Sequence, residues 1–277
     1  MTITLGGDRV VNRLGYGAMR ITGEGIWGDP PDVAAARRVL QRAVALGVNF
    51  IDTADSYGPE VSERLIAEAL HPYPPGLVIA TKGGIVRPRR ERWDSDGRPG
   101  HLRAACEASL RRLRLECIDL YQLHAIDPAV SLEDSIGELA RLRQEGKVRR
   151  VGVSNVDASQ LARARSIVDI VSVQNRYNVS DRSSDPVLAI CERDGLAFIP
   201  WSPLAQSPRD ASTGPRARLG QWARRRGLSF HQAAVAWLLA RSPAMLPIPG
   251  TSRASHLEEL VAAAALRPTA DEMREIG

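Results

Sequence analysis

The sequence predicts an α/β protein: a single (β/α)8 TIM barrel over residues 1–277, with a short β-hairpin at its N-terminus. The length of 277 residues suits this fold, which commonly runs to roughly 250 residues in one domain. Strands and helices alternate eight times from Arg13 onward, and most strands are continuous apolar runs, as in a parallel sheet covered by helices. The competing fold, an open doubly wound sheet, would normally carry a glycine-rich phosphate turn after its first strand, and that turn is missing.

The elements are predicted in order from hydrophobic periodicity and from glycine and proline positions. The N-terminal hairpin spans 3–11, with a turn at Gly6-Gly7-Asp8, and it is placed at the bottom of the barrel. The predicted strands are 13–20, 48–53, 77–82, 118–124, 148–154, 170–175, 197–201 and 246–249. The predicted helices are 32–46, 62–70, 101–115, 131–145, 158–167, 185–193, 216–226, 229–241 and 255–266. Residues 83–99, rich in Arg, Pro and Gly, are expected to form a long functional loop.

The first strand nearly matches a dinucleotide-binding fingerprint. In Arg13-Leu-Gly-Tyr-Gly-Ala-Met-Arg20 the third glycine is replaced by Arg20, and a loop rather than a helix follows. We therefore interpret Gly17 as a backbone position that another group approaches closely. The loop through Trp27 is expected to reach over this strand end.

Composition excludes several classes of protein. The net charge of +5 and the pI near 9.5 suit an anionic cofactor, whereas the basic runs 87–92 and 224–226 lack the interleaved aromatics of a single-strand nucleic-acid binder. No apolar run approaches the roughly 20 residues that cross a bilayer. The three cysteines form no Cys-x-x-Cys pair and no leader is visible, so we expect a cytoplasmic protein without a metal. The oligomeric state is open, and a monomer is compatible with the sequence.

Polar residues gather where the predicted strands end. Asp52 and Tyr57 follow the second strand, Lys82 ends the third, and His124 ends the fourth. Barrel enzymes carry their catalytic groups at the C-terminal ends of the strands, so these four side chains are expected to meet.

Together these groups would make a proton donor. A free tyrosine titrates near pH 10, and an ammonium at Lys82 would lower the pKa of Tyr57. Asp52 would keep Lys82 charged, and His124 would donate a hydrogen bond to a carbonyl oxygen. The predicted reaction is the reduction of a small-molecule carbonyl compound by hydride from a cofactor.

Other interpretations stay open at this point. Asp52 and Lys82 could form only a buried structural pair. Asp55 is interpreted as a cap of the helix that follows. A metal-dependent barrel hydrolase is disfavoured because His124 is the only histidine at a predicted strand end, whereas zinc sites gather three or four ligands.

The chain resembles the aldo-keto reductase family over almost its full length. The resemblance is carried by Asn49-Phe-Ile-Asp-Thr-Ala-Asp-Ser-Tyr-Gly58, Thr81-Lys82-Gly83, Asp119-Leu-Tyr-Gln-Leu-His124, Val151-Gly-Val-Ser-Asn155, Pro200-Trp-Ser-Pro-Leu204 and Ile248-Pro-Gly-Thr-Ser252. It implies a TIM barrel without a Rossmann motif and a catalytic tetrad at Asp52, Tyr57, Lys82 and His124.

The resemblance also implies where a nicotinamide cofactor binds. Ser154, Asn155 and Gln174 would hydrogen-bond the carboxamide, and Trp201 would stack on the nicotinamide ring. Ser202 and Leu204 would flank the pyrophosphate.

The segment from Gly250 to Leu260 would bind the adenosine and its 2′-phosphate at the entry to the last helix. The residues assigned to this end are Gly250, Thr251, Ser252, Arg253, His256 and Glu259. Gly250 replaces a lysine common in the family, and Leu260 replaces an asparagine. The predicted cofactor is NADPH, with NADH as the alternative.

Met19, Arg20 and Trp27 are the predicted substrate-pocket residues. The chain ends soon after Leu266, which implies an open pocket without a long C-terminal loop. The opening segment 15–20 is similar to bacterial members that reduce pyridoxal, so the predicted substrate is a small aromatic aldehyde, with pyridoxal as the specific hypothesis. The alternative is a non-catalytic NADPH-binding sensor, because the family includes regulatory channel subunits.

Overall fold

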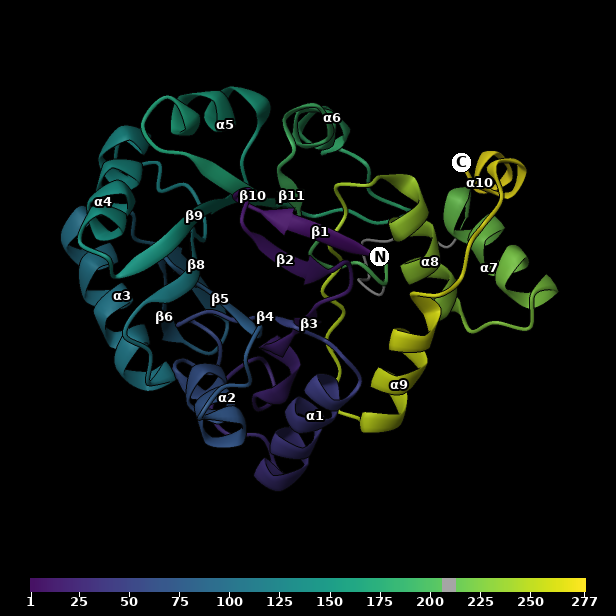
Figure 1. Cartoon of the computed structure of the whole chain (residues 1–277), viewed down its shortest axis with the longest axis horizontal. Coiled ribbons are helices and arrows are strands. Elements are labelled where there is room, and N and C mark those ends of the chain that lie inside the picture. The colour runs from purple at the N-terminus through teal and green to yellow at the C-terminus, as the bar shows by residue number, and fades with distance from the viewer. Residues whose placement is uncertain (206–212) are drawn as a thin grey trace.

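The centre of the protein is a curled parallel sheet surrounded by helices (Figure 1). The computed structural model describes residues 1–205 and 213–277. The sheet strands are β3 (Tyr16–Gly17), β4 (Phe50–Asp52), β5 (Val78–Gly83), β8 (Ile118–Leu123), β9 (Val148–Ser154), β10 (Ile170–Gln174) and β11 (Ala197–Phe198). They are ordered β11-β10-β9-β8-β5-β4-β3, and every neighbouring pair is parallel. The predicted (β/α)8 barrel is confirmed.

The barrel closes through an extended segment rather than through a regular eighth strand. Leu246 N donates to Phe198 O at 2.8 Å, while the carbonyls of Pro247 and Pro249 accept from Gly15 N at 2.9 Å and Gly17 N at 3.3 Å. The two prolines have no N–H with which to complete a hydrogen-bond ladder. The prediction of a regular strand at 246–249 is therefore wrong. The segment nevertheless lies between β11 and β3, as expected for the last strand of the barrel.

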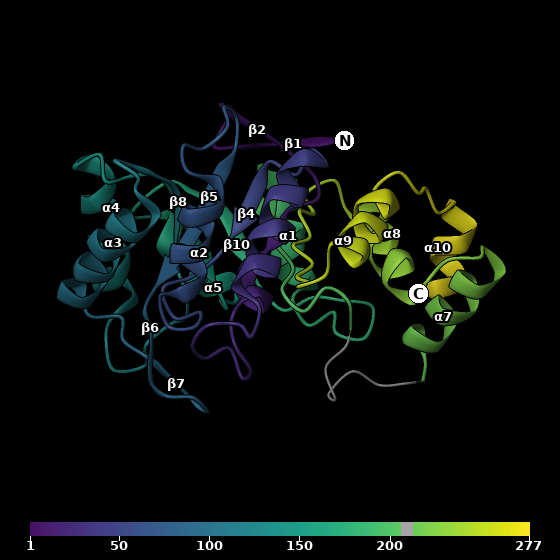
Figure 2. The same ribbon diagram turned by 90° about the horizontal axis from the view of Figure 1, so that it is seen from below.

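Helices cover the outside of the sheet. They are α1 (Val33–Ala45), α2 (Val61–Leu70), α3 (Pro99–Leu113), α4 (Leu132–Gln144), α5 (Ala158–Arg165), α6 (Asp185–Asp194), α7 (Pro215–Arg225), α8 (Phe230–Arg241), α9 (Ala254–Ala263) and α10 (Ala270–Ile276), with a 3-10 turn η1 at Ala18–Ile21. Side chains at Asp32, Ser131, Asp157 and Ser229 cap four of them, as expected for short polar residues before an apolar run. The sequence did not predict α10, which Thr269 caps through a capping box and which packs near α7 (Figure 2). Among the described residues, no helix is long and apolar enough to cross a bilayer.

The N-terminal hairpin closes one end of the barrel. β1 (Thr2–Leu5) and β2 (Arg9–Asn12) pair antiparallel, and Leu5 and Val11 are fully buried against Val78, Leu120 and other interior strand residues. The predicted hairpin and its position at the bottom of the barrel are confirmed.

A second hairpin lies at the opposite end. Residues 83–99, expected to be a loop, contain β6 (Ile85–Arg89) paired antiparallel with β7 (Arg92–Ser95). Figure 2 shows the two hairpins projecting from opposite ends of the barrel. The loop prediction is wrong because Pro88 and the arginines masked a short strand pattern. This second hairpin stands beside the strand ends that carry the candidate site.

Candidate active site

A cavity of about 590 Å³ opens at the C-terminal ends of the strands. It brings together residues from β3, β4, β7, β9 and β10 and from the segments that follow β3, β4, β8, β9, β10 and β11. The predicted site residues that line it are Gly17, Met19, Arg20, Asp52, Tyr57, His124, Ser154, Asn155, Gln174, Trp201, Ser202, Leu204 and Gly250. This collection of residues from distant parts of the chain makes the cavity the candidate active site.

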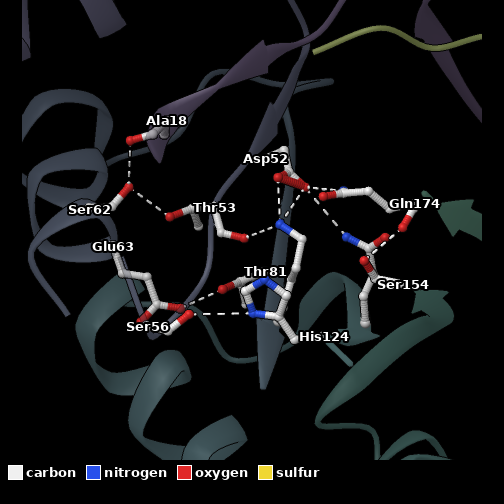
Figure 3. Close-up of polar contacts among 12 residues, drawn as sticks. Ala18, Asp52, Thr53, Ser56, Ser62, Glu63, Thr81, His124, Ser154 and Gln174 are labelled. Carbon is white, nitrogen blue, oxygen red and sulfur yellow. Dashed lines mark hydrogen bonds and ion pairs between the residues drawn. The ribbon is translucent and has the colours of Figure 1, made fainter. Parts of the chain in front are cut away.

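An ion pair lies at the floor of the cavity. Lys82 Nζ is 2.5 Å from Asp52 Oδ2 and 2.8 Å from both Asp52 Oδ1 and Thr53 O. The side chains of Lys82 and Asp52 are 0% and 2% exposed. Figure 3 shows Asp52 and Thr53 among the polar contacts of the site. Burial disfavours the ammonium, but Asp52 and Tyr57 outweigh burial and raise the pKa of Lys82. Gln174 Nε2 also donates to Asp52 Oδ1 at 2.7 Å. Lys82 is therefore a fixed, fully buried cation at neutral pH.

Tyr57 lies directly beside this cation. Its ring centroid is 5.2 Å from Lys82 Nζ, and the side chain is almost completely buried. Burial raises the pKa of Tyr57, Lys82 lowers it, and Asp52 raises it, so that the pKa is above its ordinary value. The expected effect of Lys82 has the right sign, but the expected net fall in pKa is wrong because burial of the phenol is the larger effect. Tyr57 is consequently protonated at neutral pH.

His124 completes the group. Its ring lies edge-on to Tyr57, with centroids 5.8 Å apart and an interplanar angle of 81°. Burial and the charge of Lys82 hold the pKa of His124 well below its usual range, so the imidazole is neutral. Its Nδ1 is 3.4 Å from Ser56 Oγ. When the Ser56 hydroxyl donates to Nδ1, Nε2 carries the proton and can donate to a carbonyl oxygen.

The residues expected to bind the nicotinamide form a connected polar wall. Asn155 has a left-handed backbone with φ 59°; its Nδ2 donates to His124 O at 3.0 Å and its Oδ1 accepts from Trp201 Nε1 at 2.9 Å. Ser154 Oγ donates to Gln174 O at 2.7 Å. Asn155 thus links the edge of Trp201, which lines the cavity, to the strand end that carries His124.

Two glycines bring the closing segment against β3. A Cβ added to Gly17 would lie 2.6 Å from Ile248 O, and one added to Gly250 would lie 2.6 Å from Gly17 O. Side chains at either position would push the two backbones apart. The group that closely approaches Gly17 is therefore the backbone of this chain at Ile248.

Apart from Gly250, which lines the cavity, the residues assigned to the adenosine end lie outside it, before and within α9. Thr251 Oγ1 accepts from Arg253 N at 3.1 Å and is 3.1 Å from His256 Nδ1. His256 Nε2 is 3.1 Å from Nδ1 of His231, a histidine from α8 that the sequence analysis did not single out. Ser252 and Arg253 are exposed, and Glu259 is half-buried on the same helix.

Among the predicted substrate residues, Met19 and Arg20 line the cavity and Trp27 does not. Its neighbour Ile26 lines the cavity instead, and the Trp27 ring lies 5.4 Å from the guanidinium carbon of Arg87. Trp93 and Arg176 also line the cavity and were not predicted from the sequence. Trp93 could have been suspected as an aromatic residue within a segment already expected to be functional.

Asp55 does not cap α2. The N-cap residue is Glu60, no side chain caps the helix, and Asp55 Oδ1 is buried without a hydrogen-bond partner. Burial, together with the charge of Glu63, raises the pKa of Asp55 well above its usual range. The capping prediction is wrong because the helix begins after Glu60, and Asp55 accepts from Glu60 N through its backbone carbonyl rather than through its side chain.

The described residues contain no group of three or more His, Cys, Asp or Glu side chains that could hold a metal ion. The polar chemistry of the cavity resides in the ion pair, the phenol and the imidazole.

Comparison with known proteins agrees with this geometry. Residues 13–277 match the model of the aldo/keto reductase family. The chain is 49% identical to an uncharacterized oxidoreductase of Schizosaccharomyces pombe, over 94% of this chain and 84% of that protein. It is 44% identical to pyridoxine 4-dehydrogenase of Escherichia coli, over 95% of this chain and 92% of that enzyme.

Solved structures show the same fold. A glycerol dehydrogenase from Gluconobacter oxydans superposes with a TM-score of 0.88 at 27% identity, covering 99% of this chain and 93% of the other. An aldo/keto reductase from Klebsiella pneumoniae, solved with NADP and acetate, gives a TM-score of 0.79 at 25% identity, again covering 99% and 93%. The chain described here belongs to the aldo/keto reductase family.

Proposed function

We propose that this protein is an NADPH-dependent reductase of small aromatic aldehydes, with pyridoxal as the specific candidate and Tyr57 as the proton donor. The observation that carries the proposal is the meeting of four residues in one cavity. Asp52, Tyr57 and His124 line that cavity, and the buried Lys82 contacts Asp52 directly beneath it.

The residues present suit a nicotinamide dinucleotide. Trp201 lines the cavity and would stack on the nicotinamide ring. Among the charged lining residues, Arg176 is paired with Asp181 and Asp52 with Lys82, which leaves the positive charge of Arg20. That charge suits a pyrophosphate. Ser252 and Arg253 at the start of α9 would hold a 2′-phosphate. When bound, NADPH would supply the hydride.

The chain's own groups account for the rest of the reaction. His124 would donate a hydrogen bond to the carbonyl oxygen of the substrate and orient it toward Tyr57. As negative charge develops on that oxygen, Tyr57 would transfer its proton to it, because an alkoxide is a much stronger base than a phenolate. Lys82 would stabilise the phenolate, and Asp52 would keep Lys82 in place.

Pyridoxal is the specific candidate because of the relative from Escherichia coli. That relative, pyridoxine 4-dehydrogenase, is 44% identical to this chain, and the activity in its name interconverts an alcohol and the corresponding aldehyde. The open cavity, with tryptophans at its edge, would accept a flat aromatic ring.

The test is NADPH oxidation with pyridoxal, benzaldehyde and propanal, by the wild-type protein and Tyr57→Phe. We expect turnover with the aromatic aldehydes and a loss of about 10²-fold or more in Tyr57→Phe, the size typical of general acid catalysis. Equal rates in the two proteins would refute the mechanism. Tight NADPH binding without turnover of any aldehyde would favour the non-catalytic sensor.

A further inference from the structure

The β6–β7 hairpin contributes a wall to the candidate substrate site. Trp93 of β7 lines the cavity, and its ring centroid lies 6.5 Å from that of Tyr57, with an interplanar angle of 69°. The side chain is 39% exposed, so part of the indole is free to contact a ligand. A carbonyl group within reach of Tyr57 would therefore carry its substituent close to Trp93.

One arginine holds this indole. The guanidinium carbon of Arg87 lies 3.6 Å from the ring centroid of Trp93, which is stacking distance, and 5.4 Å from the ring of Trp27. Arg87 is 8% exposed, in a protein whose other arginines are mostly at the surface. Arg87 thus makes cation–π contacts with two tryptophans.

The hydrogen bonds of Arg87 join three separate segments. The guanidinium donates to Ile26 O at 3.0 Å and Gly25 O at 3.2 Å, to Ser56 O at 3.4 Å, and to Arg92 O at 3.2 Å and Arg90 O. These carbonyls belong to the loop after β3, to the turn that carries Tyr57 and to the β6–β7 hairpin. All five are backbone acceptors.

Only a guanidinium can make this set of contacts. Its planar fork stacks on an indole and donates in several directions at once, whereas an ammonium is a compact point charge. A buried cation held by carbonyl dipoles rather than by a carboxylate is an uncommon arrangement. Its consequence here is that the Trp93 ring has one defined orientation at the cavity wall.

We propose that Arg87 is a positioning residue for Trp93, and that the Trp93 indole so held makes the site select planar aromatic carbonyl compounds over small aliphatic ones. The proposal rests on the proposed reductase function. It assigns no chemical step to Arg87, which acts through Trp93 on the binding of the substrate ring.

The test is a double-mutant cycle with benzaldehyde and propanal as the two substrates. The variants are Trp93→Ala, Arg87→Met and the double mutant, with Arg89→Met as the matched control. Arg89 lies on the same strand and is exposed. The readout is the ratio of kcat/KM for benzaldehyde to that for propanal.

We expect Trp93→Ala to lower this ratio by about 10-fold, chiefly through the KM of benzaldehyde, the size expected when one aromatic stacking partner is lost. Arg87→Met should lower it in the same way and by less. The double mutant should lower the ratio no further than Trp93→Ala alone, and Arg89→Met should have the same ratio as the wild type.

The proposal would be overturned if the variants lowered kcat/KM equally for the two aldehydes. It would also be overturned if Arg87→Met lowered the ratio as much in the Trp93→Ala background as in the wild type. Either result would mean that Arg87 supports the Tyr57 turn or the fold in general. If Arg87→Met does not fold, Arg87→Lys takes its place. Arg87→Lys keeps the charge but not the planar fork, so we expect the same loss of the ratio.

Binding separates failure of this proposal from failure of the proposed function. Benzyl alcohol and 1-propanol cannot be reduced by NADPH, so calorimetry measures their Kd in the NADPH complex without turnover. If NADPH binds and benzyl alcohol loses about 10-fold in affinity in Trp93→Ala and several-fold in Arg87→Met, the inference stands even without reductase activity. If NADPH binds and neither variant changes the Kd of benzyl alcohol relative to 1-propanol, the inference is wrong.

Discussion

The two halves of the candidate site are built differently. The proton-donating half, at the ends of β4, β5 and β8, is buried and internally paired: Lys82 is 0% exposed, and its hydrogen bonds to Asp52 and Thr53 are no longer than 2.8 Å. The half assigned to the dinucleotide includes irregular backbone at 201–205 and 246–253, with left-handed residues at Ser202 and Ala205. Arg253 there is exposed.

The difference reflects what each half has to do. A proton donor needs fixed distances and a controlled electrostatic environment, which buried strand ends provide. A binding segment needs backbone groups and side chains that a large ligand can reach, which favours exposed loops and helix starts. Substitutions in the first half should therefore change chemistry and stability together, and those in the second should change mainly affinity.

The largest expected effect is that of Lys82→Met. It removes the cation beside Tyr57 and leaves Asp52 buried and unpaired, which typically costs about 3–5 kcal/mol in the free energy of unfolding. We expect a lower midpoint in urea unfolding and a reductase rate at least about 10²-fold below the wild type.

The double variant Asp52→Asn/Lys82→Met is the control for this prediction. It removes both charges, so it should recover much of the stability but none of the activity. If Lys82→Met is as stable as the wild type, the buried pair does not have the role assigned to it.

Next in size is the effect of Arg253→Ala. Loss of one charge-assisted contact to a phosphate should raise the Kd of NADPH by about 10-fold, corresponding to ~1.4 kcal/mol, and leave the Kd of NADH nearly unchanged. Fluorescence titration measures both constants. Arg267→Ala, which removes the same charge beyond the far end of α9, is the matched control and should change neither. An equal rise for NADPH and NADH in Arg253→Ala would show that Arg253 does not contact the 2′-phosphate.

The smallest expected effect is that of pH on the wild-type rate. Burial raises the pKa of Tyr57, so the acid stays protonated through neutral pH and is lost only above about pH 10. Burial and Lys82 lower the pKa of His124, so the imidazole becomes charged only below about pH 6.5. With benzaldehyde, which does not titrate in this range, kcat/KM should be nearly constant between these limits. A steep change around pH 7 would contradict both protonation states.

The sequence predicted most of the fold because strand ends and helix caps depend on local pattern. It placed Asp52, Lys82 and His124 correctly because the ends of parallel strands converge in a barrel. It did not predict the β6–β7 hairpin or the contact of Trp93 with Arg87, which depend on packing between segments. It also predicted the wrong direction for the pKa of Tyr57, since the degree of burial of a turn residue is set by distant loops.

The sequence also failed to predict some contacts and lining residues of the half assigned to the dinucleotide and of the substrate pocket. The contact between His231 of α8 and His256 of α9 joins two residues 25 positions apart in sequence, and no local pattern predicts it. Trp27 was expected to line the cavity, yet its neighbour Ile26, whose backbone is left-handed with φ 59°, does so.

The most direct test of the account is a single-turnover measurement of hydride transfer from pre-bound NADPH to benzaldehyde, for the wild type and Tyr57→Phe. The account predicts that hydride transfer slows by about 10²-fold or more while the Kd of NADPH is unchanged, because Tyr57 donates the proton and does not hold the dinucleotide. Equal hydride-transfer rates with equal NADPH affinity would contradict the assignment of Tyr57 as the acid.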